Sequence, residues 1–356
     1  MKGVGEPQYY LGGDVTILSE HWEKQGIKYA LSAETYLGNV IPKLENMIGK
    51  QIIKYKSPME TSYQPELEDS DLLTHEESSK YRAIIGSLNW AITLGRFDIQ
   101  YATSTMARYN MSPKEGHMIA VQRILGYLKK TSEFNPRLLI NPKQPEHEEY
   151  ECFNYDNWKE FYPDAEEEIP YDILPERGPK AKITIWVDAD HAHDQVTRRS
   201  VSGIVIMING MIWKTISKRQ KTVETSTYGS ELVASRMAVE QGIALRYTLR
   251  MLGVGLEGSI LMLGDNRSVV LNTTVPSSML KKKHCAINYH RVREAIAAGI
   301  IRYAHIPSQK NVADVLTKPL AGVTMYELIK PLLFANPGEK LWPGANIEIP
   351  VVIKEN

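Results

Sequence analysis

Residues 182–190 read KITIWVDAD, and this stretch decides the fold of the second half of the chain. Apolar side chains alternate through Ile183, Ile185 and Val187, as in a strand with one face on a core, and Asp188 follows them. An aspartate inside an apolar strand is costly to bury unless it is paired, hydrogen-bonded or bound to a metal. The stretch therefore predicts a buried strand whose carboxylate is paired, hydrogen-bonded or bound to a metal.

The segments after this strand alternate between strand and helix patterns. Two more strands are SGIVIMING and MIWKTISKR, joined at Asn209-Gly210, a strong hairpin signal. The pattern then predicts a long helix, a fourth strand, two further helices, a fifth strand and a final helix, at residues 227–252, 259–265, 265–272, 285–299, 300–307 and 311–320. This order predicts an α/β (α+β) fold, in which helices flank a mixed five-stranded sheet.

The first half of the chain reads as mostly helical. Residues 9–56 begin like a strand and continue into a helical pattern at 32–48, for which Ser32 is the predicted N-cap. Residues 80–130 place apolar side chains three and four apart, which by itself indicates a small packed bundle without chemistry. The predicted division of the chain has four parts: a mostly helical part at 1–135, an acidic, proline-rich linker at 136–181, a domain at 182–320 and a tail at 321–356. The aromatic residues of the linker are expected to pack on a neighbouring domain.

Charge is unevenly distributed, although 42 basic and 42 acidic side chains cancel over the whole chain. Residues 146–168 hold ten acids and one base, whereas residues 182–319 hold nineteen Lys and Arg and ten Asp and Glu, a net charge of +9. Such a basic field suits a polyanionic partner, although basic domains that bind nothing specific are common. No apolar run is long enough for a membrane span, no signal pattern opens the chain, and two isolated cysteines fit a reducing compartment, so we expect an intracellular protein without membrane contact.

Three further acids lie on other predicted elements of this half of the chain. Glu231 lies on the first turns of the long helix, Asp265 ends the fourth strand, and Asp314 lies on the final helix. Any one of them alone is more often a cap, a surface charge or an arginine partner, but strand ends and adjacent helix starts converge at one edge of a sheet. Four hard oxygen ligands suggest Mg²⁺ or Mn²⁺, and two-metal phosphodiester hydrolysis is the chemistry that fits best.

The acids lie in five segments, VDADHAHDQVTRRSVSG, WKTISKRQKTVETSTYGSELVAS, GDNRSVV, KKKHCAINYHRVREAIAAG and NVADVLTKPL. In order and spacing these segments resemble the RNase H domain of copia-type LTR retrotransposons. The resemblance implies that Asp188, Glu231, Asp265 and Asp314 are catalytic and hold two Mg²⁺ ions, with Mn²⁺ as an alternative. It also implies endonucleolytic hydrolysis of the RNA strand of RNA–DNA hybrids.

Upstream, YRAIIGSLNWAITLGRFDIQYATSTMARY and HMIAVQRILGYLKKT resemble the C-terminal, thumb and connection side of a copia-type reverse transcriptase. The aromatic-x-Asp-Asp hairpin of a polymerase does not occur, so DNA synthesis is not expected, and the palm and fingers are expected ahead of Met1 in an intact element. The resemblance implies a truncated reverse transcriptase/RNase H Pol polyprotein. It also implies that the protein lies in the cytoplasm or the nucleus and, where the element is intact, in a virus-like particle. Two alternatives stay open: a catalytically silent nucleic-acid-binding remnant and, more weakly, a related nuclease acting on DNA.

Basic and polar residues around the acids are candidates for contacts with an RNA–DNA hybrid, although each alone is more often simply solvent-exposed. Cellular RNases H carry an auxiliary histidine before the last helix, but here that loop reads PSQKN; His305 is the nearest histidine, and His191 is given no role. The predicted nucleic-acid-binding residues are Arg198, Arg199, Lys218, Arg219, Lys221, Asn266, Lys282, Lys283, His284, His290 and Arg291, with Lys281 and Arg293 in the same basic group.

Overall fold

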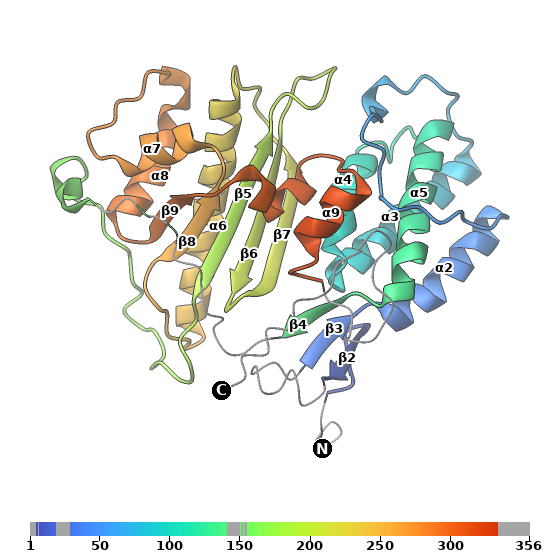
Figure 1. The fold of residues 1–356 in the computed structure, drawn as a ribbon, viewed down its shortest axis with the longest axis horizontal. Helices are drawn as coiled ribbons and strands as arrows, with labels where there is room; N and C mark the ends of the chain where they lie inside the picture. The colour runs from blue at the N-terminus through green and yellow to red at the C-terminus, as the bar shows by residue number, and fades with distance from the viewer. Residues whose placement is uncertain are drawn as a thin grey trace, which may run out of the picture.

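The computed structural model describes residues 5, 7–18, 29–140, 150, 152 and 155–333. Within this part the chain forms two sheets, each accompanied by helices (Figure 1). The first is a four-stranded antiparallel sheet in the order β1-β2-β3-β4, and the second has five strands in the order β7-β6-β5-β8-β9.

The five-stranded sheet has the predicted mixed architecture. Strand β5 is antiparallel to β6 and parallel to β8; β6 and β7 are antiparallel, and β8 and β9 are parallel. The strands are β5 (Ile183–Asp190), β6 (Val201–Ile208), β7 (Met211–Arg219), β8 (Ile260–Gly264) and β9 (Ile301–His305). The predicted hairpin turn is confirmed, because Asn209 and Gly210 both have positive φ, 53° and 79°, as a type I′ turn requires.

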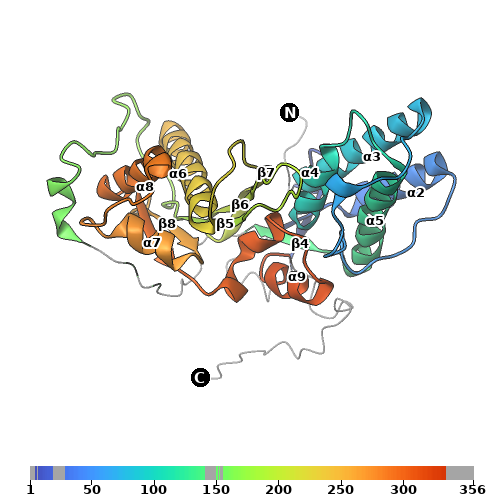
Figure 2. The ribbon, with the colours of Figure 1, turned by 90° about the horizontal axis from the view of Figure 1, so that it is seen from above.

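Helices cover both faces of this sheet. The long helix α6 (Thr227–Met251), with α7 (Arg267–Thr274) and α8 (Ala286–Ala297), packs on one face, where Val187 and Ile204 meet Leu232 in one core. On the other face, Val201 and Val205 belong to the same core as the first half of the chain. Figure 2 shows α6, α7 and α8 on one side of the sheet, and α4 and α9 on the other.

The first half is a helical bundle, as predicted, with a small sheet at one end (Figure 1). Its helices and strands are α2 (Glu34–Ile48), α3 (His75–Thr93), α4 (Gln100–Ala107), α5 (Glu115–Thr131), β1 (Tyr9–Tyr10), β2 (Gly13–Ile17), β3 (Tyr29–Ser32) and β4 (Arg137–Ile140).

The predicted N-cap Ser32 is wrong. Ser32 is the last residue of β3, and α2 begins after Ala33 without a capping side chain of its own. Register explains the difference: Asp14 of β2 lies opposite Ser32, and its Oδ2 accepts a hydrogen bond from the Thr35 backbone N–H at 2.8 Å. A carboxylate from a neighbouring strand therefore occupies the acceptor position that a local Ser would otherwise fill.

The segment predicted as an irregular linker contains ordered contacts. Its start forms β4, which pairs with β3, and Asp156–Glu160 forms the 3₁₀ helix η4. Glu167 is bound by two arginines of α6, at 2.7 Å from Arg246 and 2.5 Å from Arg250. Trp158 and Tyr162 pack on Arg293 of α8, as expected for the aromatics of this segment. The acids Glu146, Glu148, Glu149 and Glu151, and Phe153, lie outside the described residues.

The C-terminal region differs from the predicted helix over 311–320. It forms a short 3₁₀ helix, η7 (Val312–Leu316), which ends before Pro319 because the residue preceding a proline is disfavoured in the helical region. The predicted tail begins with a helix, α9 (Gly322–Ile329), which buries Met325 and Leu328 in the core of the first half. Residues 334–356 of that tail lie outside the described residues. Among the described residues, no helix combines the length and apolar character that a bilayer crossing requires.

Gly203 of β6 gives η7 room to lie on the sheet. A Cβ at this position would lie 2.7 Å from the Ala313 carbonyl oxygen and 2.6 Å from Thr317 Cγ2. We therefore expect Gly203→Ala to lower the free energy of unfolding by about 1–3 kcal/mol through overpacking, measured by urea denaturation. The matched control is Gly86→Ala in α3, where a Cβ meets nothing within 4 Å and helix propensity predicts a gain of about 0.5–1 kcal/mol. Equal effects of the two substitutions would contradict this account.

Candidate metal centre

Three of the four predicted carboxylates meet at one edge of the five-stranded sheet. Asp188 lies in β5, Asp265 directly follows β8, and Asp314 lies in η7. One carboxylate oxygen of each residue lies within 4.8 Å of one oxygen of each of the other two. Neighbouring parallel strands end at the same edge, which is why β5 and β8 bring Asp188 and Asp265 together.

Glu231, the fourth carboxylate, lies beside this cluster. It is buried on α6 at 8% exposure and is not one of the three residues whose oxygens share the 4.8 Å range. Burial, and then the negative charges of Asp188, Asp265 and Asp314, raise the pKa of its carboxyl well above the usual value. The carboxyl of Glu231 is therefore close enough to interact electrostatically with all three acids, although it is outside the group whose oxygens lie within 4.8 Å of one another.

Two sequence features hold Asp314 against the sheet. The buried Asn311 side chain donates to the Val187 carbonyl at 3.0 Å and accepts from the Ala313 N–H at 3.2 Å. Gly203, which lies opposite Asp188 in the β5–β6 register, leaves the space that η7 fills. These contacts fix the backbone of η7 next to Asp188.

The cluster holds more negative than positive charge. Lys318 Nζ lies 2.9 Å from Asp314 Oδ2, and the Thr317 hydroxyl donates to Asp188 Oδ2. Burial and the neighbouring Asp314 raise the pKa of Asp188 to about 7, and burial likewise raises the pKa of Asp314. The other oxygen of Asp314, Oδ1, is buried and has no hydrogen-bond partner among the described residues. Crowded hard oxygens, one of them unpartnered, fit a divalent cation.

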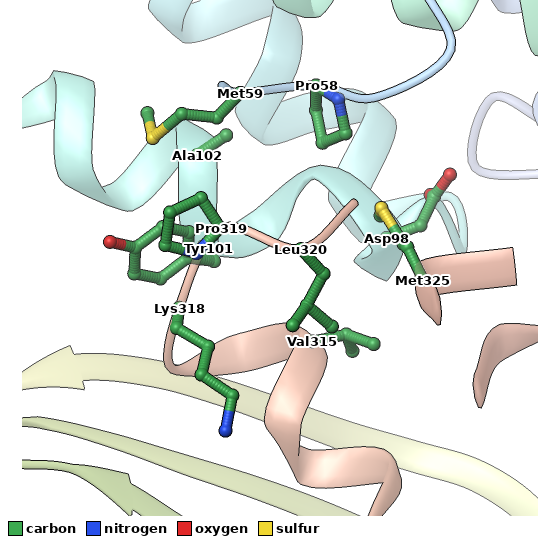
Figure 3. Close-up of a pocket in the computed structure, with 10 residues that line it drawn as sticks. All are labelled: Pro58, Met59, Asp98, Tyr101, Ala102, Val315, Lys318, Pro319, Leu320 and Met325. Atoms are coloured by element: carbon green, nitrogen blue, oxygen red, sulfur yellow. The ribbon is translucent and has the colours of Figure 1, made fainter. Parts of the chain in front are cut away.

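Lys318 is a site residue that we did not predict. It lines a small cavity between the two halves with Pro58, Tyr101 and Met325, and its amino group points away from the cavity toward the sheet (Figure 3). It lies within the NVADVLTKPL segment, four residues after Asp314, so its spacing was a signal that could have identified it.

A second unpredicted contact links the first half of the chain to this edge. The Tyr101 hydroxyl of α4 lies 2.6 Å from His193 Nε2, and His193 Nδ1 lies 2.6 Å from Asp190 Oδ2. Asp190 is the last residue of β5, two residues after Asp188. Tyr101 and His193 are 92 residues apart, so no local pattern joins them.

The predicted nucleic-acid-binding residues divide by what else they contact. Some already have protein partners: Arg219 pairs with Asp194 at 3.0 Å, Arg291 pairs with Glu294 at 2.8 Å, Lys282 donates to Ser226 Oγ, and the Asn266 side chain caps α7 by accepting from Val269 N–H at 3.1 Å. The exposed candidates are Arg198, Lys218, Lys221, Lys281 and Lys283, and Arg199 is half-buried.

The histidines and Arg293 have distinct surroundings. His290 Nδ1 lies 2.7 Å from the Tyr162 hydroxyl, and His284 Nε2 lies 3.6 Å from Glu224 Oε2. His305 Nε2 lies 3.1 Å from the Asp265 carbonyl oxygen, at the edge of the carboxylate cluster. The expectation that Arg293 belongs to the basic surface is wrong, because its side chain is buried and donates to the carbonyls of residues 272, 275 and 276.

The strand order and the flanking helices give the second half an RNase H-like fold. The solved structures similar to it include RNase H1 of Halobacterium salinarum (16% identity, 38% of this chain, 94% of that chain, TM-score 0.31). They also include LC11-RNase H1 in complex with RNA/DNA hybrid (19% identity, 38% of this chain, 94% of that chain, TM-score 0.30). No protein-family model matches the chain.

Over most of its length, the chain is homologous to retrovirus-related Pol polyproteins of copia-type transposons. It is 26% identical to the Pol polyprotein of transposon RE1 of Arabidopsis thaliana over 293 residues, which are 82% of this chain and 17% of the relative. It is 25% identical to that of transposon TNT 1-94 of Nicotiana tabacum over 341 residues, 94% of this chain and 22% of the relative. The chain thus spans about a fifth of the length of these relatives.

In metal-free protein, ionisation of Asp188 should weaken the fold. Burial and Asp314 raise the pKa of Asp188 from 3.8 to about 7. Between these values the folded state retains a proton that the unfolded state has released, so the contribution of this group to stability decreases as the pH rises from about 4 to about 7. Asp188→Asn lacks the titrating group. In EDTA, the Tm of the variant minus that of the wild type should therefore increase across this window, as measured by thermal denaturation. A difference independent of pH would contradict the pKa assignment.

Proposed function

We propose that the second half of this chain is a metal-dependent RNase H that cuts the RNA strand of RNA–DNA hybrids. The observation that carries the proposal is the meeting of Asp188, Asp265 and Asp314 at one sheet edge, with Glu231 buried beside them. The homology to transposon Pol polyproteins supports the same assignment.

The ligands proposed for two Mg²⁺ ions, or Mn²⁺, are the carboxylates of Asp188, Glu231, Asp265 and Asp314. Their donor atoms are all hard oxygens, as these cations prefer, and the unpartnered Asp314 Oδ1 provides a free ligand position. Two ions held there supply activation of water and stabilisation of the leaving oxygen in phosphodiester hydrolysis.

The protein's own contribution is to hold these acids together against their mutual repulsion. Thr317 donates to Asp188, and Lys318 pairs with Asp314, so each of these two acids keeps one oxygen in a fixed direction. Asn311 fixes the backbone that carries Asp314. The site is therefore preorganised on rigid elements, which limits the reorganisation that catalysis would otherwise require.

The nuclease proposal is tested with a labelled RNA–DNA hybrid and the purified chain in Mg²⁺. Wild-type protein is expected to cut the RNA strand, and Asp265→Asn to lower the rate by about a hundredfold or more, because it removes a charged ligand. Asp172→Asn, in an exposed turn, is the matched control and should keep full activity.

Two outcomes would overturn the proposal. Equal cleavage by the wild type and Asp265→Asn would show that another activity cuts the substrate. Hybrid binding that persists in EDTA, with no cleavage in Mg²⁺ or Mn²⁺, would instead select a silent nucleic-acid-binding remnant.

We further propose that exposed lysines before α8 contact hybrid phosphates. Lys281 and Lys283 are both exposed in the basic stretch around η5 (Lys283–Cys285). In an Asp265→Asn background, Lys281→Ala with Lys283→Ala should reduce the slope of log affinity against log salt by about 0.9 for each phosphate that the protein no longer neutralises. Binding is measured by fluorescence anisotropy over a salt series. The control pair is Lys43→Ala, on the exposed side of α2, with Lys50→Ala, just after the end of α2. This pair should leave the slope unchanged.

We propose that residues 1–135 correspond to the thumb and connection side of a reverse transcriptase. The connector at 136–181 and the RNase H domain at 182–320 follow it. Contacts between the halves through α9, η7 and the Tyr101–His193 pair support a fixed arrangement of the two. The other parts of a Pol polyprotein are the partners this assignment implies.

A further inference from the structure

A second group of metal-ligand side chains lies outside the carboxylate cluster. Glu224 is in the loop before α6, and His284 and Cys285 are in η5 before α8. One ligand atom from each of the three lies within 4.8 Å of those of the other two. No pattern in the sequence joined them, because Glu224 and Cys285 are 61 residues apart.

We propose that Glu224, His284 and Cys285 form a zinc site. A thiolate, an imidazole and a carboxylate are the three donors that Zn²⁺ takes in proteins, whereas Mg²⁺ avoids sulfur. The site therefore differs in chemistry from the four oxygen donors proposed for the nuclease, and it does not depend on that proposal.

The distances between donor atoms are close to those of a tetrahedral centre. With bonds of about 2.0 Å to nitrogen and oxygen and about 2.3 Å to sulfur, neighbouring tetrahedral ligands lie roughly 3.3–3.5 Å apart. Here Cys285 Sγ lies 3.8 Å from Glu224 Oε2, and His284 Nε2 lies 3.6 Å from the same oxygen. These two distances exceed the tetrahedral spacing by a few tenths of an ångström, and Cys285 Sγ and one ring nitrogen of His284 lie within 4.8 Å of each other.

Two of the three donor side chains, those of Cys285 and Glu224, are buried. Cys285 is fully buried and Glu224 is 9% exposed, so a thiol and a carboxylate face each other away from solvent. The other oxygen of Glu224 accepts from the Thr222 hydroxyl at 3.1 Å.

The backbone around Glu224 leaves room for this arrangement. Gly229, in the first turn of α6, approaches so closely that a Cβ there would lie 2.6 Å from Glu224 Oε2. Lys282, two residues before His284, donates its amino group to Ser226 Oγ at the N-cap of α6. The Lys282 contact holds the start of α6 against the segment that leads into η5, beside the three donor side chains.

The three donor side chains lie between the loop before α6 and η5, so a bound ion would connect these two segments. Three protein ligands would leave a fourth position for a non-protein ligand, and solvent reaches the group at His284, whose side chain is 49% exposed. Bound zinc would tie the start of α6, which carries Glu231, to η5, which carries the exposed Lys283. Zinc should therefore raise the stability of the whole chain by binding the folded state alone.

The test is titration of the metal-free full chain with Zn²⁺ in excess Mg²⁺, followed by isothermal calorimetry, and with Co²⁺, followed by its near-ultraviolet and visible spectrum. We expect one zinc per chain, a thiolate-to-cobalt charge-transfer band, and a higher Tm with zinc. Cys285→Ser should abolish the band, and His284→Ala and Glu224→Gln should weaken zinc binding by about tenfold or more.

Matched controls separate this site from the carboxylates and from adventitious thiols. His290→Ala, Cys152→Ser and the double variant Asp188→Asn with Asp314→Asn should all keep zinc binding and the cobalt band. The inference is overturned if no stoichiometric binding is observed, if the band survives Cys285→Ser, or if only the double variant loses zinc. Should Cys285→Ser fail to fold, His284→Ala still decides, because its side chain is half exposed and unchanged zinc affinity would reject the site.

Discussion

The structure depends on one electrostatic constraint, the burial of several carboxyls within a few ångströms of one another. Asp188, Asp265 and Asp314 share a 4.8 Å group, and Glu231 feels the charge of all three. In metal-free protein this repulsion is offset in part by Lys318 and by the hydroxyl of Thr317. Such a cluster is unfavourable for folding, so the surrounding contacts must hold it in place, and they are correspondingly specific.

Those contacts link the site to the whole molecule. Helix η7, which carries Asp314, is held to β5 by Asn311 and accommodated by Gly203, and it buries Leu316 in the core of the first half. Helix α9 follows it into the same core. A change in the packing of the first half would therefore alter the position of Asp314, a proposed metal ligand, because the same short segment contacts both. The two halves are coupled by packing as well as by chain connectivity.

Sequence patterns predicted most of the second half because its strands and helices are set by local periodicity. KITIWVDAD, the Asn209-Gly210 turn and the stripe of the long helix each determine their element without distant information. Failures occurred where a distant residue replaced a local one: Asp14 takes the role expected of Ser32. The convergence of three acids followed from strand order, whereas the Tyr101–His193 contact depends on how the halves pack, which no local pattern encodes.

The net charge of residues 182–319 predicted the surface available to a polyanion less directly than the strand order predicted the carboxylate cluster, for a physical reason. Not all of the nineteen Lys and Arg in residues 182–319 are available to a partner, because salt bridges and burial occupy several of them. Arg246 and Arg250 are bound by Glu167 of the acidic connector, Arg219 by Asp194, and Lys318 by Asp314. The acidic connector thus neutralises part of the basic domain on the α6 side. A polyanion would meet a smaller positive surface than the sequence suggests, formed by the exposed lysines and arginines of the loops and strand ends. Under the proposed function, specificity for a nucleic acid would depend more on where these charges lie relative to the carboxylates than on the overall field.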